Sequence, residues 1–121
     1  MGYYTSYNMD VRGLRSLDAF HALTSVLEDA GLIGSVFMPP DDTDYSPNKN
    51  TASFFCDESE KWYRHDEDMC RISMLFPEAT FRLDGNGDDP DDQWYSLYKN
   101  GRTERIKAQI VWPNPVRIEW D

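Results

Sequence analysis

The stretch from Lys61 to Gly101, KWYRHDEDMCRISMLFPEATFRLDGNGDDPDDQWYSLYKNG, contains the patterns that decide the fold. Its first part places apolar residues at helical spacing. Asp57 and Glu60 resemble a capping box. We therefore predict a helix that begins near Ser59 and ends before Pro77. The apolar stripe of this helix would consist of Trp62, Met69, Ile72, Leu75 and Phe76.

Two strands and a hairpin follow this helix. Ala79–Asp84 is predicted as a strand with Phe81 and Leu83 pointing inward, and a second strand spans Trp94–Lys99. Asn100-Gly101 is the strongest local signal in the chain, because this pair suits a two-residue type I′ turn. The return strand is expected at about 102–112. The pairs across the hairpin are then Lys99 with Arg102, Leu97 with Glu104, and Tyr95 with Ile106.

The hairpin register also predicts two faces with different chemistry. We expect the core face to collect Tyr95, Leu97, Ile106, Ala108 and Ile110. We expect the opposite, aromatic and basic face to collect Trp94, Tyr98, Thr103, Arg105 and Lys107.

The rest of the chain completes one domain, residues 1–121. Residues 3–11 alternate as a half-buried strand. Ser16 caps a helix with an apolar stripe that ends at Gly31. Residues 32–38 and 51–56 are short strand candidates. The predicted class is α+β, a mostly antiparallel sheet of four to six strands with two helices packed on one face.

Negative charge dominates the composition, with a net charge of -10. Most of it falls between residues 51 and 101, whose net charge is -7 when counted from the sequence. Such a field repels nucleic acid and membranes and favours basic partners or cations. Trp94, Tyr98, Arg105 and Lys107 could stack single-stranded nucleic acid, but the overall charge opposes this, so we expect no direct nucleic-acid binding.

Metal and catalytic motifs are incomplete. Asp84-Gly-Asn86-Gly-Asp88 opens like a calcium loop, but the sixth and twelfth positions hold Asp89 and Tyr95 instead of Gly and Glu. Weak calcium binding stays open as an alternative. His65 and the acidic residues after it lack the ligand spacing of a zinc site. Without a nucleophile elbow, P-loop or dinucleotide fingerprint, we expect neither an enzyme nor a cofactor.

The two cysteines, Cys56 and Cys70, form no C-x-x-C pair. Free thiols in a reducing cytoplasm are the simplest interpretation, although one disulfide between them is a possible alternative. The opening residues show no signal-peptide pattern, and no stretch has the length needed to span a bilayer. We therefore expect a cytoplasmic protein without a membrane partner.

Several motifs together resemble a group of small acidic proteins common in bacteriophage and prophage genomes. The motifs are Gly2-Tyr-Tyr-Thr5, Lys61-Trp-Tyr-x-His65-x-x-Asp68-Met69, Phe76-Pro77, Phe81-x-Leu83-x-Gly85-x-Gly87, and Asp92-x-Trp94-x-x-Tyr98-x-x-Gly101. The resemblance covers roughly residues 1–10 and 60–110. Most of that group has no assigned activity. This sequence departs from the Glu-rich loop of the group in having an Asp-rich loop with Pro90.

The resemblance implies a phage setting inside a host bacterial cell, where small acidic proteins often inhibit host defence. The leading hypothesis is a protein that binds a basic host protein, such as a CRISPR effector or a restriction component, and imitates nucleic acid. The predicted partner-binding residues are Asp66, Glu67, Asp68, Asp84, Asp88, Asp89, Asp91, Asp92, Trp94 and Tyr98. The alternative is a structural or accessory phage protein that forms a homodimer through the Trp94/Tyr98 face.

Overall fold

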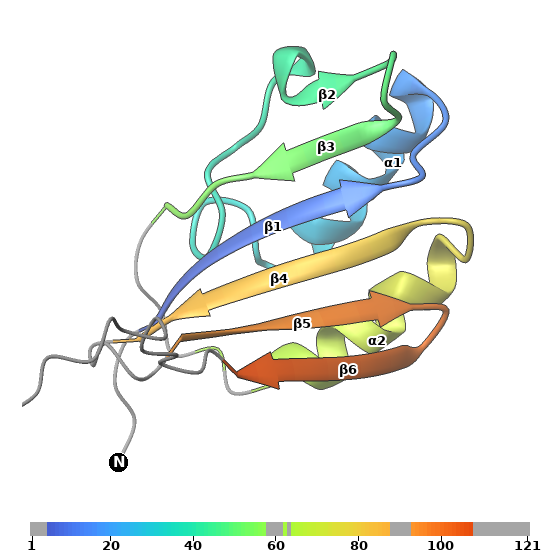
Figure 1. Ribbon diagram of the computed structural model, residues 1–121. Helices are drawn as coiled ribbons and strands as arrows, with labels where there is room; N and C mark the ends of the chain where they lie inside the picture. Colours follow the sequence, from blue (N-terminus) through green and yellow to red (C-terminus); the bar gives the residue numbers. More distant parts are fainter. Residues whose placement is uncertain (1–4, 58–61, 63, 88–92, 108–121) are drawn as a thin grey trace, which may run out of the picture.

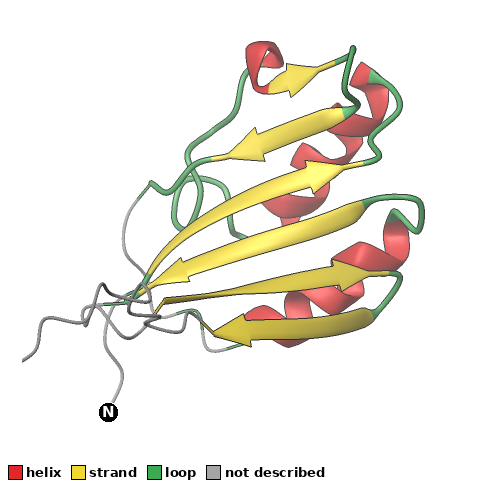
Figure 2. Cartoon of the chain, in the orientation of Figure 1, coloured by secondary structure: helices red, strands yellow, loops and turns green. Residues whose placement is uncertain are grey.

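Six antiparallel strands form one sheet in the computed structural model, which describes residues 5–57, 62, 64–87 and 93–107. Two helices cover the same face of this sheet (Figure 1 and Figure 2). The strand order is β2-β3-β1-β4-β5-β6. The strands are β1 (Ser6–Arg12), β2 (Tyr45–Ser46), β3 (Thr51–Phe54), β4 (Thr80–Asn86), β5 (Gln93–Lys99) and β6 (Arg102–Lys107). The helices are α1 (Leu17–Asp29), the 3-10 helix η1 (Asp42–Asp44) and α2 (His65–Leu75). The predicted α+β class is confirmed.

The core lies between the sheet and the two helices. In β1 and β4 every second residue is buried, because successive side chains of a strand point to opposite faces. Met9, Val11, Phe81 and Leu83 are at most 1% exposed, so the predicted inward direction of Phe81 and Leu83 is confirmed. The helices bury Phe20, Leu23, Leu27, Met69 and Ile72 against this layer.

Both predicted ends of α1 are confirmed. The Ser16 side chain accepts a hydrogen bond from the backbone N–H of Ala19. At the other end Gly31 has a positive φ of 76°, and the next residue, Leu32, donates its N–H to the carbonyl of Leu27. This is the Schellman arrangement, which satisfies the last carbonyls of a helix.

Helix α2 is shorter than predicted, since it begins at His65 and not near Ser59. Ser59 and Glu60 lie outside the described residues. Trp62 precedes the helix but is still buried, at 8% exposure. Arg64 occupies the N-cap position without a side-chain cap. The helix ends before Pro77 as predicted.

The apolar stripe of α2 also differs from the prediction at its last turn. Leu75 is 61% exposed, although the helical spacing placed it on the buried stripe. The segment 32–38 forms no named strand either. It makes only single bridges, Ile33 with Phe37 and Phe37 with Cys56.

The β5–β6 hairpin has the predicted turn and register. Asn100 and Gly101 both have positive φ, and Lys99 pairs with Arg102, Leu97 with Glu104, and Tyr95 with Ile106. The predicted faces of β5 are wrong, however, because Tyr98 is fully buried and Tyr95 is only partly covered. Ala108 and Ile110 lie outside the described residues.

The pairing of β5 with β4 explains this reversal. Tyr98 lies opposite Phe81, Ser96 opposite Leu83, and Trp94 opposite Gly85. Directly opposite residues in an antiparallel pair share a face, so β5 follows the inward face of β4. Trp94, Ser96 and Tyr98 therefore face the helices, and Tyr95 and Leu97 face the uncovered side of the sheet.

Candidate functional site

Of the ten residues predicted to bind a partner, the six that the structure describes do not form one surface. Asp88, Asp89, Asp91 and Asp92 lie outside the described residues. Asp66, Glu67 and Asp68 lie in the first turn of α2. Asp84 points to the uncovered face of the sheet and accepts a hydrogen bond from Arg82 at 2.8 Å. The sheet therefore separates Asp84 from the carboxylates of α2.

The carboxylate of Asp66 is held by partners inside the protein. Tyr98 Oη donates to Asp66 Oδ1 at 2.5 Å, and Arg105 Nη2 donates to Oδ2 at 3.2 Å. Burial raises the pKa of Asp66, but the Tyr98 hydrogen bond and the charges of His65 and Arg105 outweigh it and leave this pKa below its ordinary value. Burial and the hydrogen bond to Asp66 raise the pKa of Tyr98. The Tyr98–Asp66 hydrogen bond thus connects β5 to α2.

His65 lies in an aromatic cluster beside Asp66. Its ring stacks on Trp94 with centroids 4.9 Å apart, and only 14% of its side chain is exposed. Trp62 and Tyr7 contact the same ring at centroid distances of 6.1 Å. The guanidinium of Arg105 lies 4.4 Å from the Trp94 ring centre, a distance suited to a cation–π contact. Trp94 thus packs against the core and is only partly exposed.

The other two carboxylates of the α2 first turn also have internal partners. Asp68 accepts a hydrogen bond from Trp62 Nε1 at 2.8 Å, which satisfies the indole N–H of a buried ring. Glu67 pairs with Arg64 at 2.7 Å. Negative charge at a helix N-terminus is favourable, and α2 lacks a side-chain cap there. Two residues of the acidic run that predicted a partner surface, Asp66 and Asp68, therefore connect α2 to the sheet and to Trp62, whereas Glu67 pairs only with the neighbouring Arg64.

The environment of His65 predicts a pH dependence of stability. Burial lowers the pKa of His65, and the charge of Arg105 adds to this effect while that of Asp66 opposes it. As the pH falls through 6.5, the unfolded chain binds a proton that the folded protein resists. The free energy of unfolding is therefore expected to decrease as the pH falls through 6.5, as measured by urea denaturation. This window lies above that of Asp66, whose lowered pKa places its loss of stability at acidic pH below 3.8.

His65→Gln is expected to remove most of this decrease, whereas His21→Gln, the same change at the other histidine, is expected to leave it. The slope with pH is the quantity compared, because losing the stack on Trp94 lowers stability at every pH. Equal slopes for wild type and His65→Gln would contradict the assignment.

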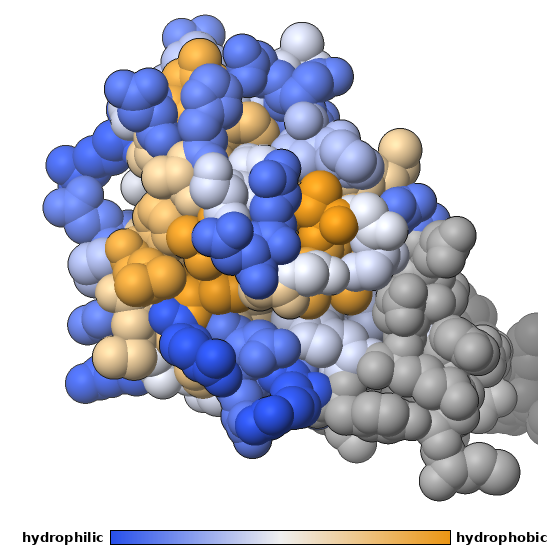
Figure 3. Space-filling view, turned by 180° about the vertical axis from the view of Figure 1, so that it is seen from behind, coloured by the Kyte–Doolittle hydropathy of each residue, from blue (hydrophilic) through white to orange (hydrophobic). Residues whose placement is uncertain are grey.

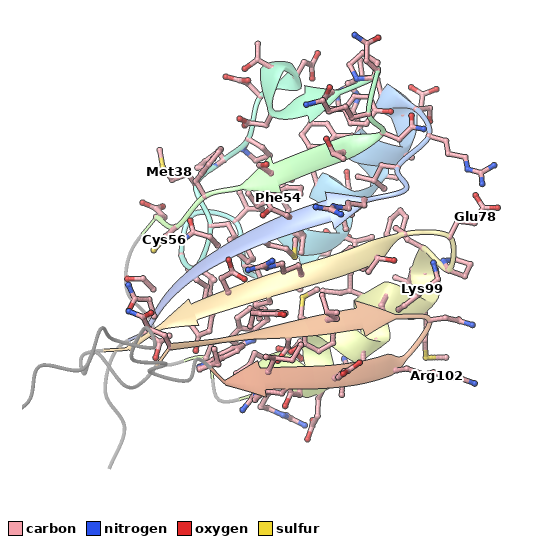
Figure 4. The ribbon with its side chains drawn as sticks, viewed as in Figure 1. Met38, Phe54, Cys56, Glu78, Lys99 and Arg102 are labelled. Atoms are coloured by element: carbon pink, nitrogen blue, oxygen red, sulfur yellow. The ribbon has the colours of Figure 1, made fainter. Side chains whose placement is uncertain are left out.

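The thiols and the calcium-like residues are not members of this aromatic cluster, although Cys70 lies one turn from Asp66 in α2. Both cysteines are free, Cys56 beyond β3 in the part of the chain near Met38 (Figure 4) and Cys70 in α2. Burial, followed by the charge of Asp66, raises the pKa of Cys70, which favours the thiol over the nucleophilic thiolate. Asp84 and Asn86, the first ligand positions of the predicted calcium loop, are residues of β4. Among the described residues, no group of three or more His, Cys, Asp and Glu side chains is placed to hold a metal ion.

A second acidic region, which sequence reasoning missed, comprises residues of α1 and of η1 with its N-cap. Between Arg15 and Lys49 the chain contains six carboxylates and neither lysine nor arginine. We call this the α1 acidic surface; it consists of Asp18, Glu28, Asp29, Asp41, Asp42 and Asp44. The sequence signal that could have revealed this region is the absence of lysine and arginine between residues 16 and 48, because the number of acidic residues there is not unusual by itself.

The α1 acidic surface differs from the α2 first turn in its contacts. Within the described residues, Asp18, Glu28 and Asp29 are exposed and form no ion pair. Asp42 contacts His21 at 2.7 Å, which joins η1 to α1. Asp41 caps η1 through the backbone N–H of Thr43. Within the α1 acidic surface, the three carboxylates of α1 are thus more open to an external cation than Asp41 and Asp42.

Comparison of the chain with family models, with curated proteins and with solved structures finds no match. The resemblance to small acidic phage proteins therefore stays a prediction. None of the helices within the described part of the chain has the length and apolar character needed to cross a bilayer.

Proposed function

We propose that this chain is a non-enzymatic, phage-type interaction protein that binds and inhibits a basic host protein. The partner would be a nucleic-acid-handling or defence protein, such as a CRISPR effector or a restriction component, in the host cytoplasm. The observation that carries the proposal is the α1 acidic surface, six carboxylates in residues 16–48 without lysine or arginine. The net charge of -10 supports it.

The physical basis is competition for a cationic groove. Exposed carboxylates form charge-assisted hydrogen bonds with Arg and Lys, as phosphate oxygens do. A strongly acidic protein is also steered towards a basic partner over several ångströms, in a salt-dependent manner. Carboxylates without internal partners serve this purpose better, because no existing ion pair has to be broken. Asp18, Glu28 and Asp29 meet this condition, while Asp66, Glu67 and Asp68 are already bonded inside the protein.

Phage plating tests the proposal. The protein is expressed in bacteria that carry a CRISPR or restriction system, and plating of a targeted phage is compared with an empty-vector strain. The proposal expects plating to be restored in at least one of these immune strains. Unchanged plating in all of them, with the folded protein present in the cells, would contradict inhibition of these systems.

The acidic loop gives a further prediction. Charge reversal of Asp88, Asp89, Asp91 and Asp92 is expected to reduce the protection of the phage, because it places cations opposite a basic partner. The thermal midpoint is expected to stay close to that of the wild type. Full protection of the phage by this variant in the plating assay would exclude the loop from the interface. The α1 acidic surface would then be the remaining candidate.

A further inference from the structure

The two helices leave a groove between them on the helix side of the sheet. They run in opposite directions over the sheet and do not pack closely on each other (Figure 1). At the end where α1 begins and α2 stops, a cavity of about 290 Å³ opens to the surface. We call it the interhelical groove; its apolar lining is Leu14, Ala19, Leu75, Phe76, Pro77 and Ala79. Seen from the helix side, apolar side chains gather in the middle of this face between hydrophilic regions (Figure 3).

Leu75 makes this groove more than a gap in the packing. It is 61% exposed, while Leu14 and Ala79 on the groove floor are at most 2% exposed. The wall of the groove opposite Leu75 is formed by α1 and projects little, because α1 contributes only the small side chain of Ala19 there. Ala22 lies almost one turn further on the same side of α1 and is exposed. An apolar side chain from another protein therefore has room between Leu75 and α1.

The charges around the groove are unequal. On the α2 side, Arg71 pairs with Asp68 at 3.7 Å, and at the open end Arg15 pairs with Glu78 at 3.4 Å. Within each of these pairs the positive and the negative charge neutralise each other. On the α1 side, Asp18 and Asp29 lie about 40° and about 20° from Ala22 around the helix axis, both on the side turned further from the sheet, and α1 contains no lysine or arginine to balance them. The groove is thus apolar inside and negative along one rim.

We propose that the interhelical groove binds a basic amphipathic helix of the partner. Its apolar side chains would pack against Leu75 and Ala19, and its Lys or Arg side chains would reach Asp18 and Asp29. The inference rests on the proposed function and adds the surface and the partner chemistry. A second copy of the chain fits poorly, because two negative rims would face each other in a protein of net charge -10.

A synthetic amphipathic peptide of leucine and lysine, about four helical turns long, serves as the probe. A scrambled peptide of the same composition is the control. In NMR titrations we expect the amphipathic peptide to shift the amide signals of Ala19, Ala22, Leu75 and Phe76, and the scrambled peptide to bind more weakly and without this focus. Leu75→Gln is expected to weaken binding by at least about tenfold, through loss of buried apolar contact.

Met74→Gln is the matched control, because Met74 is also 61% exposed but lies on another side of α2, near Gly101. It is expected to bind the peptide as the wild type does. If Leu75→Gln does not fold, Asp18→Asn/Asp29→Asn tests the rim and is expected to weaken binding of the amphipathic peptide specifically.

Three results would overturn the inference. They are equal binding of both peptides, equal effects of Leu75→Gln and Met74→Gln, and a concentration-dependent dimer that Leu75→Gln abolishes. Phage plating distinguishes failure of the groove inference from failure of the proposed function. Full protection by Leu75→Gln would reject the groove and retain the function, whereas peptide binding without protection by the wild type would reject the function and retain the groove.

Discussion

Tyr98→Ala is expected to lower the free energy of unfolding by about 3–5 kcal/mol, the range for removing a fully buried aromatic ring. Tyr98 is 0% exposed, lies opposite Phe81 in the sheet and donates its hydroxyl to Asp66. The alanine variant would leave a cavity under α2 and remove a partner of a partly buried carboxylate. Urea denaturation followed by circular dichroism measures the loss.

Tyr95→Ala is the matched control, three residues earlier on the same strand and on the opposite face. Its ring is only partly covered and lies 4.1 Å from the guanidinium carbon of Arg82. We expect a loss of about 1 kcal/mol or less. A larger loss for Tyr95→Ala than for Tyr98→Ala would contradict the face assignment of β5 and restore the one that the hairpin pattern predicted.

Gly13→Ala is expected to cost about 3 kcal/mol or more, as the sum of a left-handed backbone and an overpacked contact. Gly13 follows β1 with a φ of 94°. A Cβ atom there would lie 2.6 Å from the carbonyl oxygen of Glu78 and 3.2 Å from the Cα of Ala79. Both neighbours are backbone atoms, so the clash cannot be relieved by rotating a side chain. Thermal and urea unfolding measure the effect.

Gly31→Ala separates the two causes. Gly31 also has a positive φ, but a Cβ atom would meet nothing within 4 Å. Only the conformational cost of about 1–2 kcal/mol is expected there. Equal losses at the two glycines would contradict the close approach between the β1–α1 and α2–β4 connections, which also forms the floor of the interhelical groove.

The local parts of the fold were predictable from sequence because their signals are local. Ser16 and Gly31 mark the ends of α1 through bonds to residues within one or two turns. Asn100-Gly101 fixes the hairpin register in the same way. The face of β5 was not predictable from its own alternation, since aromatic residues occupy both sides of the strand. The pairing of β5 with β4 determines which face of β5 is buried, and the length of the loop between these strands does not set their register.

The candidate site was predictable only in its chemistry. The acidic run at Asp66 was visible in the sequence, but its main partners are Tyr98 and Arg105, which are 32 and 39 residues away. Contacts at such separations follow from the tertiary fold and not from spacing. The start of α2 was missed for a related reason, because Trp62 is buried by Asp68 and neighbouring rings without being helical.

This division of the carboxylates changes where an interaction is expected. Asp66 bonds to Tyr98 and Arg105 of the sheet and Asp68 bonds to the buried Trp62, so altering these two would confuse loss of binding with loss of structure. The carboxylates of α1 can be altered with little effect on folding. Asp18 lies in the first turn of α1, where its negative charge stabilises the helix. Glu28 and Asp29 lie at the C-terminal end, where negative charge is unfavourable. Neutralising all three is therefore expected to leave stability nearly unchanged.

The most direct test compares two triple variants in the phage-plating assay. Asp18→Asn/Glu28→Gln/Asp29→Asn neutralises the carboxylates of α1, and Asp10→Asn/Asp57→Asn/Glu104→Gln changes the net charge equally at exposed positions elsewhere. With three exposed ion pairs lost, we expect the α1 variant to bind its partner about tenfold more weakly and to lose protection of the phage. The control variant is expected to protect as the wild type does. Full protection by the α1 variant, or equal loss in both variants, would contradict the assignment of binding to the α1 acidic surface.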